Sequence, residues 1–429
     1  MSGIPLRMVC AAAGLAVVAI ASAPAALAQA SSKVLTLQQA LSRAAAANPR
    51  LAAAGFDVGI ADGRRRQAGA VPNPEASVEV DNILGSGAYR GTRSAETTLQ
   101  LSQLIELGGK RQARIAAGLA ETDGAIWQRE AERLAVLSDT ATAFVSVLGA
   151  QRRVQIIDEQ VMALDRLTPE LRRRVEAGAS SPAEISRAQV ATDLLRVEGL
   201  RARTSLATER RELAVLMGDS SPTFASVTGQ FASTGRPPSF QSLLAAINSN
   251  PQLIRWTAVR AQREAELLTA RLKPIPDLRV SAGWRHYNDT GDSAVRLGIS
   301  VPLPVWDQNQ GDIAAANETL RKTRAEREIN KAALIGVAGR AYDAATGALA
   351  ELSLLRSSVL PNSRKAADAV NEGYVQGRFT LLDLLDAQSA VAQAALREQE
   401  ALQSFHTAVT TIEGLVGRPF VLARERSSK

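Results

Sequence analysis

The chain has 429 residues, 50 Lys and Arg against 43 Asp and Glu, and a formal net charge of +7. Of its residues 46% are hydrophobic but only 4% are aromatic, and many are alanine, which favours helix and close helix packing. Two histidines and one cysteine exclude a multi-histidine zinc centre and a disulfide framework. We therefore expect no catalytic residue, no cofactor and no bound metal, and an enzyme is the least supported class.

The N-terminus has the pattern of an export signal. Arg7 is the only charge before an apolar run at 8–28, which ends in Ala26-Leu27-Ala28. This pattern fits a signal peptide cleaved after Ala28; a membrane anchor is the alternative, and Pro24 argues against it. The single cysteine, Cys10, lies too early in the run to accept a lipid, so no lipid anchor is expected. Export also argues against a nucleic-acid partner for this basic chain.

No uncharged apolar stretch of about 18 residues follows residue 28, so no transmembrane helix is expected there. Any part that spans a membrane must then be built from strands, because only helices and closed barrels satisfy the backbone in lipid.

One pattern occurs twice along the chain. Asn48-Pro49 recurs 202 positions later as Asn250-Pro251, and Pro72 and Pro74 recur at the same offset. Further matches keep their order at offsets of 198 to 199 and pair Leu99 with Leu297, Gly178 with Gly377, Gln189 with Gln388 and Leu216 with Leu415. The predicted organisation is a signal peptide (1–28), a first repeat (29–218), a linker rich in Ser, Thr, Gly and Pro (219–238), a second repeat (239–420) and a polar tail (421–429).

Each repeat contains one predicted hairpin, at about 75–104 and at about 277–303. Its strands of about ten residues alternate apolar and polar positions. Two isolated hairpins do not make a stable soluble sheet, whereas such strands suit a membrane barrel with one face toward lipid. Four strands cannot close a barrel, so the barrel must be shared, and three chains would supply 12 strands.

Long helices fill the rest of each repeat. One runs from Gly109 to about Glu176, and the return segments at 185–216 and 384–416 carry mainly apolar or small residues at steps of three and four. That pattern is typical of coiled coils. Pro169 and Pro361 are expected to interrupt and bend the outgoing helices. The predicted fold is thus mainly α with a small β part: a duplicated helix–strand–strand–helix protomer with long antiparallel coiled coils.

Two motifs at the ends of the hairpins carry a family resemblance: Gln-Leu-Ile-Glu-Leu-Gly-Gly-Lys-Arg at 103–111 and Pro-Leu-Pro-Val-Trp-Asp-Gln-Asn-Gln-Gly at 302–311. Over residues 35–420 the chain resembles the TolC-like outer-membrane factor family, and within it the outer-membrane subunit of cobalt–zinc–cadmium efflux systems. The resemblance implies a homotrimer with a 12-strand barrel in outer-membrane lipid and a long periplasmic tunnel. It also implies two partners, a periplasmic adaptor protein and an inner-membrane RND-type transporter.

The two helix-to-helix turns are candidate docking sites. Glycines fit the left-handed position that ends a helix, and a Ser or Thr followed by an acid three residues later fits a capping box. Helix capping alone is enough to explain why these residue types occur at the turns. The resemblance implies in addition that the adaptor docks there, at Gly178, Ser181, Glu184, Gly377, Arg378 and Thr380.

A periplasmic gate is the second candidate site. Asp383 and Asp386 stand one turn apart on one helix face, and the resemblance places them in the acidic rings of the closed entrance, which attract cations. A salt bridge from Asp386 to Arg187 is the alternative. Tyr374 matches a gate-linking tyrosine of the family, but Phe379 stands where its arginine partner is expected, with Arg378 one position earlier.

The resemblance implies a passive exit duct for divalent heavy-metal cations exported by a proton-driven pump. A duct of the same type for drugs, organic solutes or type I protein secretion is the alternative. A periplasmic coiled-coil protein without a transport role is the second alternative.

Overall fold

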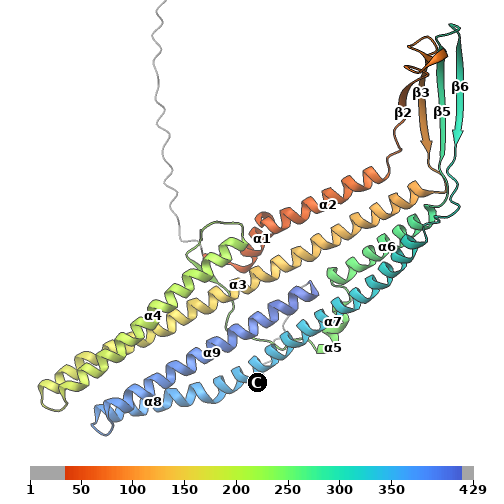
Figure 1. Ribbon diagram of the computed structural model, residues 1–429. Coiled ribbons are helices and arrows are strands. Elements are labelled where there is room, and N and C mark those ends of the chain that lie inside the picture. The colour runs from red at the N-terminus through yellow and green to blue at the C-terminus, as the bar shows by residue number, and fades with distance from the viewer. Residues whose placement is uncertain (1–33, 418–429) are drawn as a thin grey trace, which may run out of the picture.

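The computed structural model describes residues 34–417 (Figure 1). The predicted signal peptide at 1–28 and polar tail at 421–429 lie outside the described residues. The helices are α1 (Leu37–Ala47), α2 (Pro49–Ala68), α3 (Lys110–Glu176), α4 (Pro182–Leu216), α5 (Phe240–Ile247), α6 (Pro251–Leu272), α7 (Gln310–Leu354), α8 (Leu360–Val375) and α9 (Leu381–Val416). The strands are β1 (Val34–Thr36), β2 (Glu75–Asp81), β3 (Glu96–Ile105), β4 (Ser226–Thr228), β5 (Leu278–Tyr287) and β6 (Ser293–Ser300). The molecule is elongated, with a sheet at one end and two helix turns at the other (Figure 1).

The duplication is visible in equivalent helix caps. Asn48 caps α2 and donates its side-chain amide to the carbonyl of Leu216 at the end of α4, at 2.8 Å. Asn250 caps α6 and donates to the carbonyl of Leu415 near the end of α9, at 2.7 Å. Each asparagine side chain therefore accepts a free backbone N–H at the start of its helix, as the Asn-Pro repeat suggested. It also joins the beginning of its repeat to the end.

The two hairpins form one antiparallel sheet in the order β2-β3-β5-β6. The register aligns Val78, Leu99, Trp284 and Val295 in one row, so the predicted apolar positions share one face. β2 has seven residues and β6 eight, shorter than the predicted ten. The β3–β5 pairing joins the two repeats, and it leaves β2 and β6 as free edges.

The outgoing helices of the two repeats differ at their prolines. α3 continues through Pro169 for 67 residues, so the prediction of an interruption there is wrong. Leu164 and Leu171 are buried on either side of Pro169, and this packing holds the helix across the missing hydrogen bond. In the second repeat a π-helical turn at Leu355–Val359 separates α7 from α8 just before Pro361, which confirms an interruption near that residue.

The 219–238 segment contains a strand that the sequence did not reveal. β4 pairs in parallel with β1, and Phe224 and Val227 are buried. The Gln151 side chain of α3 accepts the Val227 N–H at 2.8 Å and donates to its carbonyl at 3.0 Å. These contacts tie the segment to the coiled coil.

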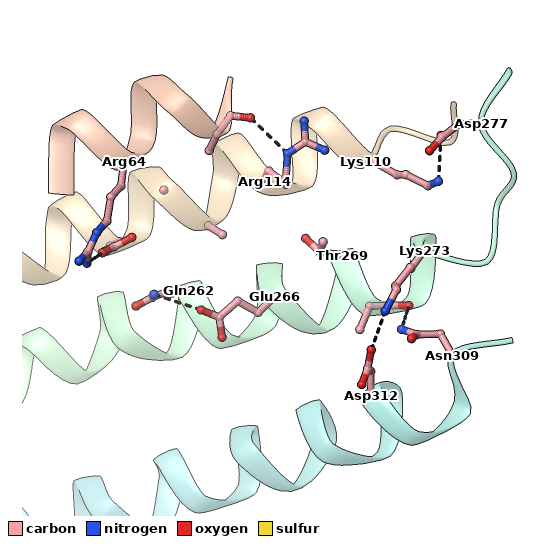
Figure 2. Close-up of a pocket in the computed structure, with 15 residues that line it drawn as sticks. Arg64, Lys110, Arg114, Gln262, Glu266, Thr269, Lys273, Asp277, Asn309 and Asp312 are labelled. Carbon is pink, nitrogen blue, oxygen red and sulfur yellow. Dashed lines mark hydrogen bonds and ion pairs between the residues drawn. The ribbon is translucent and has the colours of Figure 1, made fainter. Parts of the chain in front are cut away.

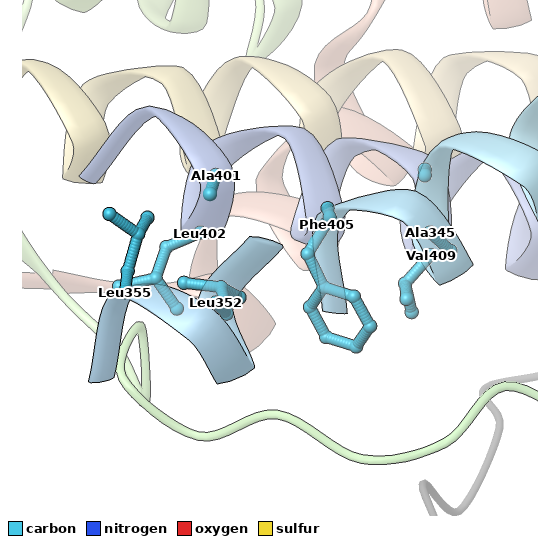
Figure 3. Packing of buried hydrophobic residues seen from close by; sticks show 9 residues of the cluster. Ala345, Leu352, Leu355, Ala401, Leu402, Phe405 and Val409 are labelled. Carbon is cyan, nitrogen blue, oxygen red and sulfur yellow. The ribbon is translucent and has the colours of Figure 1, made fainter. Parts of the chain in front are cut away.

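Small residues bring the long helices close together. Between α7 and α9, alanines alternate with larger side chains around Phe405, which has no exposed surface (Figure 3). The cluster comprises Ala345, Ala348, Leu352, Leu355, Ala401, Leu402, Phe405, Ala408 and Val409. Such close contact explains the alanine-rich composition.

One described helix, α3, contains an 18-residue window apolar enough, by length and composition alone, to cross a membrane. A third of that window is buried inside the chain, and α3 packs against α2, α4, α6 and α9. The central helix of a coiled coil, which is buried against its neighbours, can contain an equally apolar window.

Candidate functional site

The turn between α3 and α4 is one of two tips at the same end of the molecule (Figure 1). Gly178 has φ +71°, and its N–H donates to the carbonyl of Val175 at 3.0 Å. The Ala179 N–H donates to the carbonyl of Arg174 at 2.8 Å, which completes a Schellman motif. The left-handed position predicted for Gly178 is confirmed.

The cap of α4 is simpler than expected. The Ser181 hydroxyl accepts the Ala183 N–H at 3.3 Å, two positions on, and not the N–H of Glu184. The predicted capping box with Glu184 is therefore wrong; with the serine on the nearer N–H, the reciprocal geometry does not form.

The turn between α8 and α9 has both a Schellman motif and a capping box. Gly377 has φ +75°, and Arg378 donates its N–H to the carbonyl of Gly373 at 2.8 Å. The Thr380 hydroxyl accepts the Asp383 N–H at 3.2 Å, and the Asp383 carboxylate accepts the Thr380 N–H at 2.8 Å. Hydrogen bonds from the Thr380 hydroxyl and then its backbone hold the pKa of Asp383 below its usual value. This capping box is confirmed, and it occupies the carboxylate of one of the two aspartates predicted to form a gate.

The two tips are joined by a buried cluster of Leu171, Ala188, Tyr374, Leu381 and Leu384. Arg174 of α3 donates to the Tyr374 carbonyl at 2.9 Å, and its guanidinium lies 4.6 Å from the centre of the tyrosine ring. Burial raises the pKa of Tyr374, whose hydroxyl has no hydrogen-bond partner in the described chain. The partner of this tyrosine is thus an arginine of the other repeat, which sequence reasoning missed because 200 positions separate the two residues.

Phe379, which replaces the arginine expected beside Tyr374, covers Gly373 so closely that a side chain there would clash with its ring. Asp386 and Arg187 are both exposed, and within residues 34–417 neither makes an ion pair. The alternative salt bridge between them does not form in the single chain.

The first strand-to-helix motif forms a charged junction between the repeats (Figure 2). Lys110 contacts the Asp277 carboxylate at 2.8 Å, and Asp277 also accepts the Leu107 N–H at 3.1 Å. Arg114 makes a two-pronged pair with Glu106 at 2.5 and 2.9 Å, and its hydrogen bonds hold the pKa of Glu106 below its usual value. The Asp277 contacts join the end of β3 to the start of β5, and the Arg114–Glu106 pair ties the end of β3 to α3.

A groove of about 670 Å³ lies beside this junction, between α2, α3, α6 and α7. The cations that line it are paired with carboxylates. Figure 2 shows Lys110 with Asp277 and Lys273 with Asp312. Arg64 pairs with Glu121, and Arg114 pairs with Glu106 outside the groove lining. These contacts fasten helices to one another and neutralise the charges of the groove.

Among residues 34–417, no three His, Cys, Asp or Glu side chains gather as metal ligands. His286 contacts the Ser293 hydroxyl at 3.2 Å, within the β5–β6 hairpin. His406 contacts the Phe231 carbonyl at 2.8 Å, and burial lowers its pKa.

The chain matches the family model described as outer membrane efflux protein over residues 40–219 and 243–418. The cobalt-zinc-cadmium resistance protein CzcC of Cupriavidus metallidurans is 32% identical over 384 residues, which cover 90% of each chain. The nickel and cobalt resistance protein CnrC of the same organism is 27% identical over 67% of each chain. The structure of CusC, whose report concerns transmembrane channel formation, superposes with a TM-score of 0.77 at 15% identity and covers 89% of this chain and 92% of that one. This chain belongs to the family of outer membrane efflux proteins: it is an outer membrane channel protein and not an enzyme.

Proposed function

We propose that three copies of this chain form the passive exit duct of a tripartite efflux system. The observation that carries the proposal is the sheet, which has an exposed apolar face and two free edges in the single chain. Val295, Leu297 and Ile299 are 76%, 78% and 73% exposed on that face. Three such sheets joined at their edges supply a 12-strand barrel in outer-membrane lipid, and the helices extend it as a periplasmic tunnel.

The proposed cargo is a divalent heavy-metal cation. Support comes from CzcC and CnrC, which are named for resistance to cobalt, zinc, cadmium and nickel. The sequence contains no phosphate-binding loop, so the energy for export must come from another protein. We assign this role to an inner-membrane RND-type transporter.

The adaptor is proposed to dock on the two tips. Next to the predicted docking residues, Val375, Phe379 and Leu382 are 67%, 45% and 58% exposed. Apolar side chains at the turns of two helical hairpins are a suitable surface for a third, coiled-coil hairpin.

Deletion of the gene is expected to lower the minimal inhibitory concentrations of zinc, cobalt, nickel and cadmium, because the pump loses its exit. The native chain supplied in trans should restore them, and a set of drugs and detergents serves as the comparison. Sensitivity to drugs alone would overturn the metal cargo but keep the duct. Unchanged sensitivity to all compounds would contradict the duct.

A cation gate at Asp383 and Asp386 is the second part of the proposal. Three copies place each aspartate in a ring of three like charges, which attracts divalent cations. Because Asp383 also caps α9, Asp386→Asn is the cleaner variant. We expect Asp386→Asn to weaken divalent-cation block of single-channel conductance in planar bilayers, and the double variant with Asp383→Asn to weaken it further.

The control is Asp368→Asn, which removes an exposed carboxylate of α8 away from the tip. Block that is unchanged in both the single and the double gate variant would contradict the gate. An equal loss of block in the control would show a general effect of charge.

A further inference from the structure

The segment between β4 and α5 lies against the second repeat in the middle of the molecule, away from the sheet and from both tips (Figure 1). Two contacts hold it there. The Phe231 ring stacks on the His406 ring with 5.5 Å between their centres, and the Phe231 carbonyl lies 2.8 Å from His406 Nε2. Arg356 donates to the Ala232 carbonyl at 3.2 Å. This part of the segment is therefore fixed against α9 and the π-helical turn.

A pocket of about 370 Å³ lies between the next residues of this segment and the end of α7. The apolar part of its lining comes from one stretch of α7, at Leu349, Ala350 and Leu352. The polar part consists of two hydroxyls and two guanidiniums, from Thr234, Ser353, Arg236 and Arg356. Among the described residues that line the pocket there is no carboxylate. The lining is therefore positively charged.

The polar groups of the pocket have unused hydrogen-bonding capacity. Arg236 and the hydroxyls of Thr234 and Ser353 make no hydrogen bond or ion pair with any residue of 34–417. Arg356 uses Nε on the Glu398 carboxylate at 2.7 Å and Nη2 on the backbone of the segment, so Nη1 is left without a partner in the same described range. Guanidinium groups only donate, and hydroxyls can donate as well. Such a lining suits a ligand with negatively charged acceptor atoms.

The local backbone positions both arginines. Arg236 precedes Pro237 and Pro238, and a residue before proline is restricted to extended conformations. Arg356 belongs to the π-helical turn at Leu355–Val359, a rare conformation that often accompanies functional sites. The ion pair with Glu398 also holds its guanidinium. Because both cations are partly positioned in advance, less conformational entropy is lost when a ligand binds.

The equivalent position of the first repeat is apolar. The caps Gly109 and Asn309, both left-handed, relate α3 to α7 by 200 positions. Arg356 then corresponds to Ile156, which is 4% exposed, and the adjacent Ile157 is 3% exposed. The coiled coil is thus built with a buried isoleucine at this position in one repeat and a guanidinium in the other. The packing of the fold does not by itself require the arginine.

We propose that this pocket binds a carboxylate, which belongs to the C-terminal end of a peptide or to a small organic acid. The carboxylate oxygens accept hydrogen bonds from the Arg236 guanidinium and from Nη1 of Arg356, and the apolar part of the ligand lies against Leu349 and Leu352. The volume is within the range of small-molecule sites. The described lining comes from one chain and lies away from the tips, so this function is additional to the proposed duct and does not depend on its cargo.

Titration calorimetry of the purified full-length protein tests the site with three probes. N-acetyl-Ala-Ala-Leu with a free C-terminus should bind saturably, and the same peptide with a C-terminal amide should not. Isocaproate keeps only the carboxylate end of the leucine. Binding of isocaproate as well as the peptide identifies an organic-acid site, and binding of the peptide alone identifies a site for a peptide terminus.

Arg236→Gln should weaken binding of the free peptide about tenfold or more, because a hydrogen bond to a charged group is lost. Arg236 makes no contact within residues 34–417 that would affect folding, so the helix content and melting temperature should be unchanged. The matched control is Arg364→Gln on α8, which removes another exposed arginine that is unpaired in this range and should leave binding unchanged.

Chemical modification locates the ligand independently of affinity. Phenylglyoxal followed by mass spectrometry should label Arg236 in the free protein and label it less in the presence of the peptide, while labelling of Arg364 stays the same. Equal binding of the amidated peptide, unchanged affinity in Arg236→Gln, or no protection of Arg236 would each overturn the site. So would the absence of saturable binding of both the free peptide and isocaproate below about 10 mM.

Discussion

Leu384→Ala is expected to lower the free energy of unfolding by about 2–5 kcal/mol. Leu384 has no exposed surface and packs in the cluster that joins the two tips, so truncation leaves a cavity between the coiled coils. Leu382, two residues earlier on the same helix, is 58% exposed. Leu382→Ala should change stability by less than about 0.5 kcal/mol.

Denaturant unfolding of the purified protein, followed by helix content, measures the difference between the two leucine variants. Limited proteolysis should locate it, with faster cleavage at the tips in Leu384→Ala only. Similar stability losses in both variants would contradict the packing of the tip cluster. Because Leu382 belongs to the proposed docking surface, a weaker adaptor interaction in Leu382→Ala with unchanged stability would separate docking from folding.

Gly218→Ala is the second substitution with a large expected effect. Gly218 has φ +85°, and an added Cβ would lie 2.6 Å from the carbonyl oxygen of Ala47, a backbone atom that cannot move aside without shifting α1. A left-handed alanine costs about 1–2 kcal/mol, and overpacking adds about 1–3 kcal/mol. We expect a loss of about 2–5 kcal/mol in total.

The matched control is Gly178→Ala, where φ is +71° but no atom lies within 4 Å of the added Cβ. It should show the backbone cost alone, about 1–2 kcal/mol. Thermal unfolding of both variants against the native protein measures the two costs side by side. An equal loss at the two glycines would show that the contact with Ala47 adds nothing.

Local patterns predicted most elements of this chain correctly. The Asn-Pro pairs predicted the starts of α2 and α6, and alternation predicted which strand residues share a face. Thr380 and Asp383 predicted their capping box. These features depend on residues within one turn or on strand neighbours, so their energies are written in short stretches of sequence.

The predictions that failed concern features that depend on contacts or backbone geometry outside the local sequence pattern. Pro169 should break a helix by itself, yet buried leucines on both sides hold α3 continuous. β4 has three residues and no signal of its own, and it exists because β1 lies beside it. Ser181 and Glu184 satisfy the capping pattern, but the backbone of the turn brings the serine to a different N–H.

The duplication, the helix and strand types and the polarity of the sheet faces all follow from the spacing of residues along the chain, so they can be read from the sequence. How the repeats join depends on packing in three dimensions: the β3–β5 pairing, the Lys110–Asp277 junction and the Arg174–Tyr374 contact. Partners about 170 to 200 positions apart have no local signature, since their free energy is gained only when packing has already brought the two repeats together.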